Sequence, residues 1–167
     1  LQDFKLILGN EIYLCRDGLS AETYEKGEKF PHFILLAKDE IGHGQLRELS
    51  TRAWKHSFTM FLTRTPTYYQ DVEEVIKKNP GHIVASSACV GGWLGICKMN
   101  GTEHNAIAFI KWCKELFGDD FYLELQPARY QEQIEYNKWL IWLGKETDTK
   151  CIITTDSHYL KKEDREI

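Results

Sequence analysis

The chain has 167 residues, of which 43% are hydrophobic and 28% charged, with a formal net charge of −4. This length and apolar content suffice for a single domain with a buried core, and the acidic balance argues against a module that binds nucleic acid through a basic surface. No apolar stretch approaches the length of a membrane span and the N-terminus lacks the pattern of a secretory signal, which predicts a cytoplasmic protein without a membrane partner.

Strand-like and helix-like segments alternate along the chain. The strand-like segments are apolar runs rich in Ile, Val, Leu, Phe and Tyr, at Lys5–Leu8 continuing into Glu11–Leu14, His32–Ala37, His82–Ala88, Phe121–Leu125 and Cys151–Thr155. The helix-like segments carry apolar residues at helical spacing, at Ile41–His56, Tyr68–Lys78, Glu103–Phe117 and Tyr130–Lys145. Arg16–Pro31 is polar and indicates a long loop. This order predicts an α/β fold with a mainly parallel sheet, either a barrel or a doubly wound layer.

The cysteines predict neither a disulfide framework nor a zinc knuckle, because their number is odd and no two have Cys-x-x-Cys spacing. Cys97, Cys113 and Cys151 lie within apolar patterns and are expected in the core. Cys89 differs, because it follows an apolar run and precedes a Gly-Gly pair, where backbone and ligand can approach closely. For Cys89 the local alternative is a small buried hydrophobic side chain.

Asp156 and His158 follow the last apolar run and are two residues apart. In extended backbone this spacing places both side chains on one side, where a carboxylate and an imidazole can bind one cation or adjacent cations. The alternative is that Asp156 caps a helix beginning near Lys161, with His158 as an ordinary loop residue.

Two further candidates occur in the first apolar runs. Glu11 interrupts such a run, where a charge is costly unless it is paired or bound to a metal. His32 opens the next run, although a histidine at a strand edge can also be exposed or simply hydrogen-bonded. The other histidines are assigned no role.

Several short segments, spread over almost the whole chain, occur in the following order: Gly9-Asn10-Glu11, His32–Ala37, Leu46–Ala53, Ser87–Gly92, Phe117–Leu125 and Thr155–Leu160. Together they resemble the PHP domain of DNA polymerase III alpha subunits, from bacteria or their phages. The Phe117–Leu125 segment separates this subfamily from stand-alone PHP phosphatases. The resemblance places five residues on metal-ligand positions of the family's multinuclear site: Glu11, His32, Cys89, Asp156 and His158.

The resemblance implies a distorted (β/α)7 barrel of the TIM-like kind. It also implies a DNA-directed DNA polymerase whose PHP domain is a metal-dependent phosphoesterase with 3′–5′ exonuclease activity on DNA. Carboxylate, imidazole and thiolate ligands suit borderline divalent metals, and clustered metals can clamp the attacking and leaving oxygens of a phosphodiester. Zinc is favoured, with manganese and iron left open. The implied partners are the primer 3′ end of DNA, the remainder of the polymerase chain and other replisome subunits.

The sequence departs from the family pattern at its start, because the family's N-terminal His-x-His motif and the Asp and His that follow it are not found. Residues 1–167 are therefore expected to form the C-terminal portion of a PHP domain, an incomplete barrel that holds part of the metal cluster. The barrel edge near Glu11 is expected to be open, so that this region pairs with another chain or lacks order.

Two other functions remain as alternatives. In some polymerases of this family the PHP domain has lost its ligands and serves as a structural platform. Cys89 and the Asp156-x-His158 pair favour metal binding over that role, although a metal can also act only as a structural staple. The second alternative is a stand-alone PHP phosphatase acting on a small phosphate ester, against which Phe117–Leu125 argues.

Overall fold

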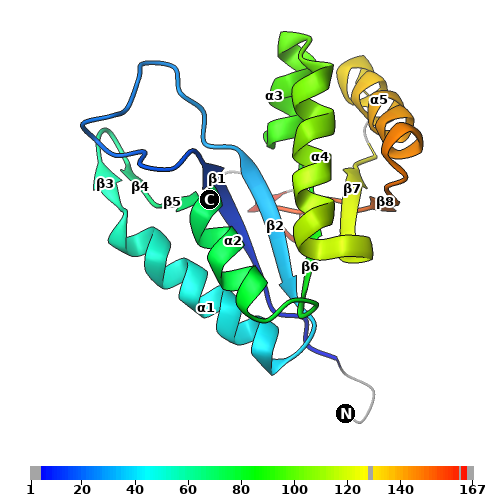
Figure 1. Cartoon of the computed structure of the whole chain (residues 1–167). Coiled ribbons are helices and arrows are strands. Elements are labelled where there is room, and N and C mark those ends of the chain that lie inside the picture. Colours follow the sequence, from blue (N-terminus) through cyan, green and yellow to red (C-terminus); the bar gives the residue numbers. More distant parts are fainter. Residues whose placement is uncertain (1–4, 128–129, 162, 165–167) are drawn as a thin grey trace.

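The computed structural model describes residues 5–127, 130–161 and 163–164, and strands and helices alternate along much of its length (Figure 1). In chain order the elements are β1 (Gly9–Cys15), β2 (His32–Ala37), α1 (Glu40–Lys55), β3 (Phe58–Thr59), β4 (Thr63–Arg64), β5 (Pro66–Tyr68), α2 (Tyr69–Lys78), β6 (Ile83–Ser86), α3 (Trp93–Asn100), α4 (Glu103–Phe117), the 3-10 helix η1 (Gly118–Asp120), β7 (Phe121–Leu125), α5 (Gln131–Thr147) and β8 (Cys151–Ile153).

Most of the predicted elements are present. Strands β2 and β7 and helix α4 have the predicted bounds, and β6, β8, α1, α2 and α5 differ from the prediction by one or two residues at one or both ends. The prediction of a strand at Lys5–Leu8 is wrong. The carbonyl of Leu8 accepts a hydrogen bond from the N–H of Ala37, but the side chains of Leu6 and Ile7 are exposed, and β1 begins only at Gly9.

Helix α3 is an element that the sequence pattern does not indicate. It has eight residues, with Leu94 and Cys97 buried, which is too short a stretch to establish a helical period. A Cβ at Gly95 would lie 1.8 Å from the carbonyl oxygen of Val90. The glycine is therefore required where the first turn of α3 packs against the segment that follows β6.

The strands form one main sheet in the order β5-β1-β2-β6-β7-β8 in the described part of the chain. The pairs β1–β5, β6–β7 and β7–β8 are parallel, and β1–β2 and β2–β6 are antiparallel. The predicted α/β class with a largely parallel sheet is thus confirmed. Among the described residues no pairing joins β5 to β8, so the predicted barrel is not observed in closed form.

The expectation that the region near Glu11 lacks order is wrong. Strand β1 lies inside the sheet, where all of Gly9–Tyr13 pairs with β2 and Tyr13–Cys15 pairs with β5. The short β5 segment was not anticipated from the sequence. It pairs with Tyr13–Cys15, and among the described residues Gly9–Ile12 have no strand partner on that side. The two terminal strands of the described sheet are β5 and β8 instead.

Helices pack against the sheet in two groups. Helix α1 contacts α2, β2 and β5, and α4 contacts α3, α5, β6 and β7; α2 also contacts α4, which joins the two groups. In Figure 1, α1 lies beside α2 and α3 beside α4. None of the helices in the described residues combines the length and the apolar character needed to cross a bilayer.

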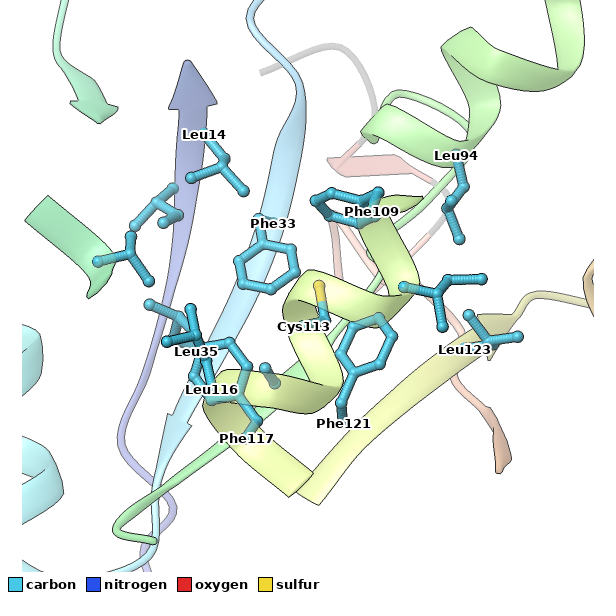
Figure 2. Packing of buried hydrophobic residues seen from close by; sticks show 14 of the residues in the cluster. Leu14, Phe33, Leu35, Leu94, Phe109, Cys113, Leu116, Phe117, Phe121 and Leu123 are labelled. Atoms are coloured by element: carbon cyan, nitrogen blue, oxygen red, sulfur yellow. The ribbon is translucent and has the colours of Figure 1, made fainter. Parts of the chain in front are cut away.

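The core is centred on Phe33 of β2 (Figure 2). Its ring lies 5.9–6.5 Å from those of Phe109 and Trp112 on α4, Phe117 at the end of α4 and Phe121 on β7. Aromatic pairs at this separation add to the stabilisation that their buried area supplies. This cluster therefore fastens α4 to the middle of the sheet.

The cysteines are partly where the sequence predicts them. Cys97 and Cys113 are buried in the core as expected, and burial raises the pKa of the Cys113 thiol well above its usual range. The prediction that Cys151 belongs to the core is wrong, because it is exposed. It opens β8, a terminal strand of the sheet, which has a paired neighbour on one side only.

Candidate metal centre

Glu11 and His32 come together because of the register between β1 and β2. Glu11 lies opposite Ile34, and His32 lies opposite Tyr13. Alternate residues of a strand share a face, so Glu11 and His32 are diagonal neighbours on one face of the sheet. The Oε1 atom of Glu11 is 3.0 Å from Nδ1 of His32. This face is partly exposed, while Phe33 points from the other face into the core.

Cys89 reaches the same point from β6, the other neighbour of β2. Its Sγ atom lies 3.5 Å from Nδ1 of His32. The chain turns sharply just before it, at Ala88, whose φ is 59°, a left-handed conformation that residues other than glycine adopt infrequently. The turn carries Cys89 beyond the end of the strand and aims its thiol at the histidine.

Gly91 packs directly against both His32 and Cys89. Its backbone N–H donates to Sγ of Cys89 at 3.3 Å, and its carbonyl accepts from the N–H of His32 at 3.2 Å. A Cβ at this position would lie 3.3 Å from Nδ1 of His32 and 3.4 Å from Sγ of Cys89. The missing side chain thus lets the backbone approach both candidate ligands.

The surroundings of Cys89 oppose ionisation of its thiol. Burial raises the pKa of the Cys89 thiol, and the neighbouring carboxylates of Asp156 and Glu11 raise it further, against the lowering effect of the Gly91 N–H. A bound divalent cation would reverse the balance, because positive charge stabilises a thiolate.

Asp156 and His158 follow β8, and their conformation differs from the one assumed from the sequence. Asp156 has a φ of 48°, so the extended backbone expected around it is not found. The Nδ1 atom of His158 lies 2.8 Å from the backbone oxygen of Asp156 and 3.9 Å from its Oδ1. The imidazole is 75% exposed, and among the described residues it has no hydrogen bond or ion pair with Glu11, His32 or Cys89.

The donor set suits a cation in its chemistry. Two carboxylates, an imidazole and a thiol are the ligand types that zinc and similar metals take in proteins. Glu11 and Cys89 both lie within 3.5 Å of one ring nitrogen, Nδ1 of His32. In the described part of the chain, no group of three or more His, Cys, Asp or Glu side chains surrounds a common point as metal ligands do.

Glu124 is a buried carboxylate to which the sequence pattern assigned no role. It is 7% exposed, in the middle of the apolar strand β7. Its carboxylate accepts hydrogen bonds from the hydroxyls of Ser86 and Thr154. The signal that marked Glu11, a charge within an apolar run, marks Glu124 equally well.

Comparison with protein families gives one match, to the PHP domain, over residues 2–128. The matched range contains Glu11, His32 and Cys89, together with Gly91 and Glu124. It ends before Asp156 and His158, so the family match does not extend to these two candidates.

Individual relatives extend over nearly the whole chain. A protein named "Probable DNA polymerase YorL" from Bacillus subtilis is 47% identical over 185 aligned positions, which cover 99% of this chain and 14% of that protein. The DNA polymerase III subunit alpha of Aquifex aeolicus is 39% identical, and the alignment covers 98% of this chain and 14% of that protein. The DNA-directed DNA polymerase of Bacillus phage SPbeta is 47% identical with the same 99% coverage of this chain. The chain thus spans about one seventh of the length of these relatives.

Proposed function

The chain belongs to the PHP domain family, and on that premise we propose that it is the metal-binding phosphoesterase region of a DNA polymerase of the DNA polymerase III alpha type. The resemblance that the sequence suggested is confirmed by the family match and by the relatives that cover almost all of the chain. In our proposal the region hydrolyses the terminal phosphodiester at a DNA 3′ end, and its partners are that DNA, the rest of the polymerase chain and other replisome subunits.

The observation that carries the proposal is the convergence of Glu11, His32 and Cys89. Glu11 lies on β1, His32 on β2 and Cys89 in the segment that follows β6; Oε1 of Glu11 and Sγ of Cys89 lie 3.0 and 3.5 Å from Nδ1 of His32. Acidic, imidazole and thiol groups gathered on the open face of a sheet do not contribute to the core, which lies on the other face. Their grouping brings together side chains of the types that bind divalent metals, which the stability of the fold alone does not require.

Each candidate residue has a distinct role in this proposal. A divalent metal, with zinc favoured over manganese or iron, would supply Lewis-acid charge for phosphodiester hydrolysis. Glu11 and Asp156 would provide the negative charge that holds cations beside an anionic substrate. His32 would bind through Nδ1, the atom that already faces Glu11 and Cys89. Cys89 would bind as a thiolate, and His158 would complete the set from its exposed position.

Metal affinity is expected to rise with pH, and Cys89 is the reason. Burial and two carboxylates raise the pKa of its thiol, so the metal-free protein keeps the thiol protonated near neutrality and the metal must displace that proton. One displaced proton strengthens the apparent affinity by about tenfold per pH unit. Zn²⁺ titration against a chromophoric chelator between about pH 6 and pH 8 measures this slope. Cys89→Ser should bind more weakly with a smaller slope, and an equal slope in both proteins would contradict the assignment.

The activity can be tested on the full-length protein that carries this chain. A 5′-labelled DNA strand is incubated without nucleotides or pyrophosphate, and shortening from the 3′ end is followed. Chelation should abolish the shortening, and Zn²⁺ or Mn²⁺ should restore it. His32→Asn should lose the activity, while His43→Asn, on helix α1 and away from the cluster, should keep it.

A non-catalytic structural role in the polymerase is the second candidate. It is favoured by one observation, that in the described residues no three candidate ligands surround a common point. Tight metal binding with no 3′ shortening in the same assay would select this role. We do not propose a stand-alone phosphatase on small esters, because the relatives described above are named as DNA polymerases.

A further inference from the structure

Glu124 occupies the strand between the two segments that bear candidate ligands. Its strand β7 pairs with β6 on one side and β8 on the other. Cys89 lies three residues beyond the end of β6, and Asp156 lies three residues beyond the end of β8. A side chain on β7 can therefore contact both the end of β6, which leads to Cys89, and the end of β8, which leads to Asp156.

The hydrogen bonds of Glu124 reach both of these segments. One carboxylate oxygen, Oε2, accepts from the hydroxyl of Ser86 at the end of β6. The other, Oε1, accepts from the hydroxyl of Thr154 at 2.6 Å, directly after β8, and from the side-chain amide of Gln126 at 3.1 Å. The backbone N–H of Glu124 donates to the hydroxyl of Ser87 at 2.9 Å. The residue thus ties β6 and β8 across β7.

This arrangement distinguishes Glu124 from the candidate ligands. Both of its oxygens are engaged by donors, and the side chain is buried, which leaves it poorly suited to bind a cation directly. A buried carboxylate is costly unless it is hydrogen-bonded, and here three donors offset that cost. Its carboxylate is committed to organising the protein rather than to binding a ligand.

The segments that Glu124 ties together contain turns that need support. Ala88, next to Cys89, has a φ of 59°, and Asp156 has a φ of 48°. Left-handed backbone at residues other than glycine persists when surrounding contacts fix it. Ser86, the last residue of β6, and Thr154, the first residue after β8, are each two residues before one of these turns, so the bonds to Glu124 fix the chain shortly ahead of each turn.

We propose that Glu124 is a positioning residue that sets the separation between Cys89 and Asp156, so that a metal can engage both. This inference rests on the proposed metal-binding function and deepens it. It predicts that replacing Glu124 weakens metal binding even though the side chain does not contact the metal. Groups that orient ligands from behind commonly change metal affinity by about 10–100-fold.

The test uses Co²⁺ titration of the full-length protein, followed by the near-ultraviolet absorption of a cobalt–thiolate bond. The signal is defined as the part of this absorption that Cys89→Ser removes. Glu124→Gln keeps the size of the side chain but places an amide where one hydroxyl must donate. We expect about tenfold weaker Co²⁺ affinity or more, with the same Cys89-dependent band recovered at saturating Co²⁺. Recovery of the band separates a change in positioning from loss of the fold.

Matched variants keep the outcome decisive. Glu73→Gln is the control, because Glu73 on α2 likewise accepts side-chain hydrogen bonds, from Trp112 and Lys77, and should leave the affinity unchanged. If Glu124→Gln does not fold, Thr154→Val removes one of the two ties and should weaken binding several-fold. Wild-type affinity in whichever of these variants folds would overturn the inference. No Cys89-dependent absorption in the wild-type protein would instead overturn the proposed function, and this inference with it.

Discussion

The Asp156→Asn protein is expected to lose its metal-dependent 3′-exonuclease activity by about 100-fold or more, since even groups that only support a ligand cost roughly 10–100-fold. Asparagine keeps the size of the side chain and removes its charge. It also tolerates left-handed backbone well, so the φ of 48° at this position can be retained. The expected loss therefore reports the carboxylate and not the turn that holds it.

The measurement is shortening of a labelled DNA strand by the metal-replete, full-length protein. Asp119→Asn serves as the control. Asp119 is an exposed aspartate of η1, so this substitution makes the same chemical change away from the cluster. It should keep wild-type activity. Unchanged nuclease activity in Asp156→Asn would rule out a catalytic metal at this residue.

Phe33→Ala is expected to destabilise the fold by about 3–5 kcal/mol, the usual cost of removing a buried phenylalanine from a core. The Phe33 side chain is 1% exposed and packs against four other aromatic rings. Its removal would leave a cavity between β2 and α4 that the surrounding rings cannot fill without moving. Native-state hydrogen exchange of the β2 and β6 amides measures the effect, as exchange more than about 100-fold faster.

The matched control is Phe61→Ala. The Phe61 side chain is 96% exposed, between β3 and β4, and a surface substitution of this kind changes stability by about 0.5 kcal/mol or less. Similar exchange rates in the two variants would show that the aromatic cluster is not what fastens α4 to the sheet.

The elements that were predicted correctly from the sequence are those with a clear pattern of apolar residues over their whole length. Helix α4 has apolar residues along four turns, and its predicted bounds are confirmed. Strands β2 and β7 are mainly apolar runs, broken only by His32 at the start of β2 and Glu124 within β7, and they too have the predicted bounds. The α/β class and the family follow from these elements and from the motifs between them.

Features that depend on tertiary contact could not be predicted in the same way. Strand β5 is three residues long and exists because Tyr13–Cys15 offers it a partner. The exposure of Cys151 depends on β8 being a terminal strand, which is a property of the sheet order. The pattern placed Glu11, His32 and Cys89 in separate runs, and only the pairing of β1, β2 and β6 brings them together.

The pairing of β1 with β2 makes the candidate centre sensitive to insertions in a way that depends on where they fall. Sliding β1 by one residue against β2 would turn Glu11 away from His32 and into the face that holds the core. A single-residue insertion or deletion between Gly9 and Tyr13 would therefore destroy both the centre and the packing. The same change within Arg16–Pro31, which joins the two strands outside the sheet, would cost little. Length variation in related chains should accordingly be found in that loop and be absent from β1.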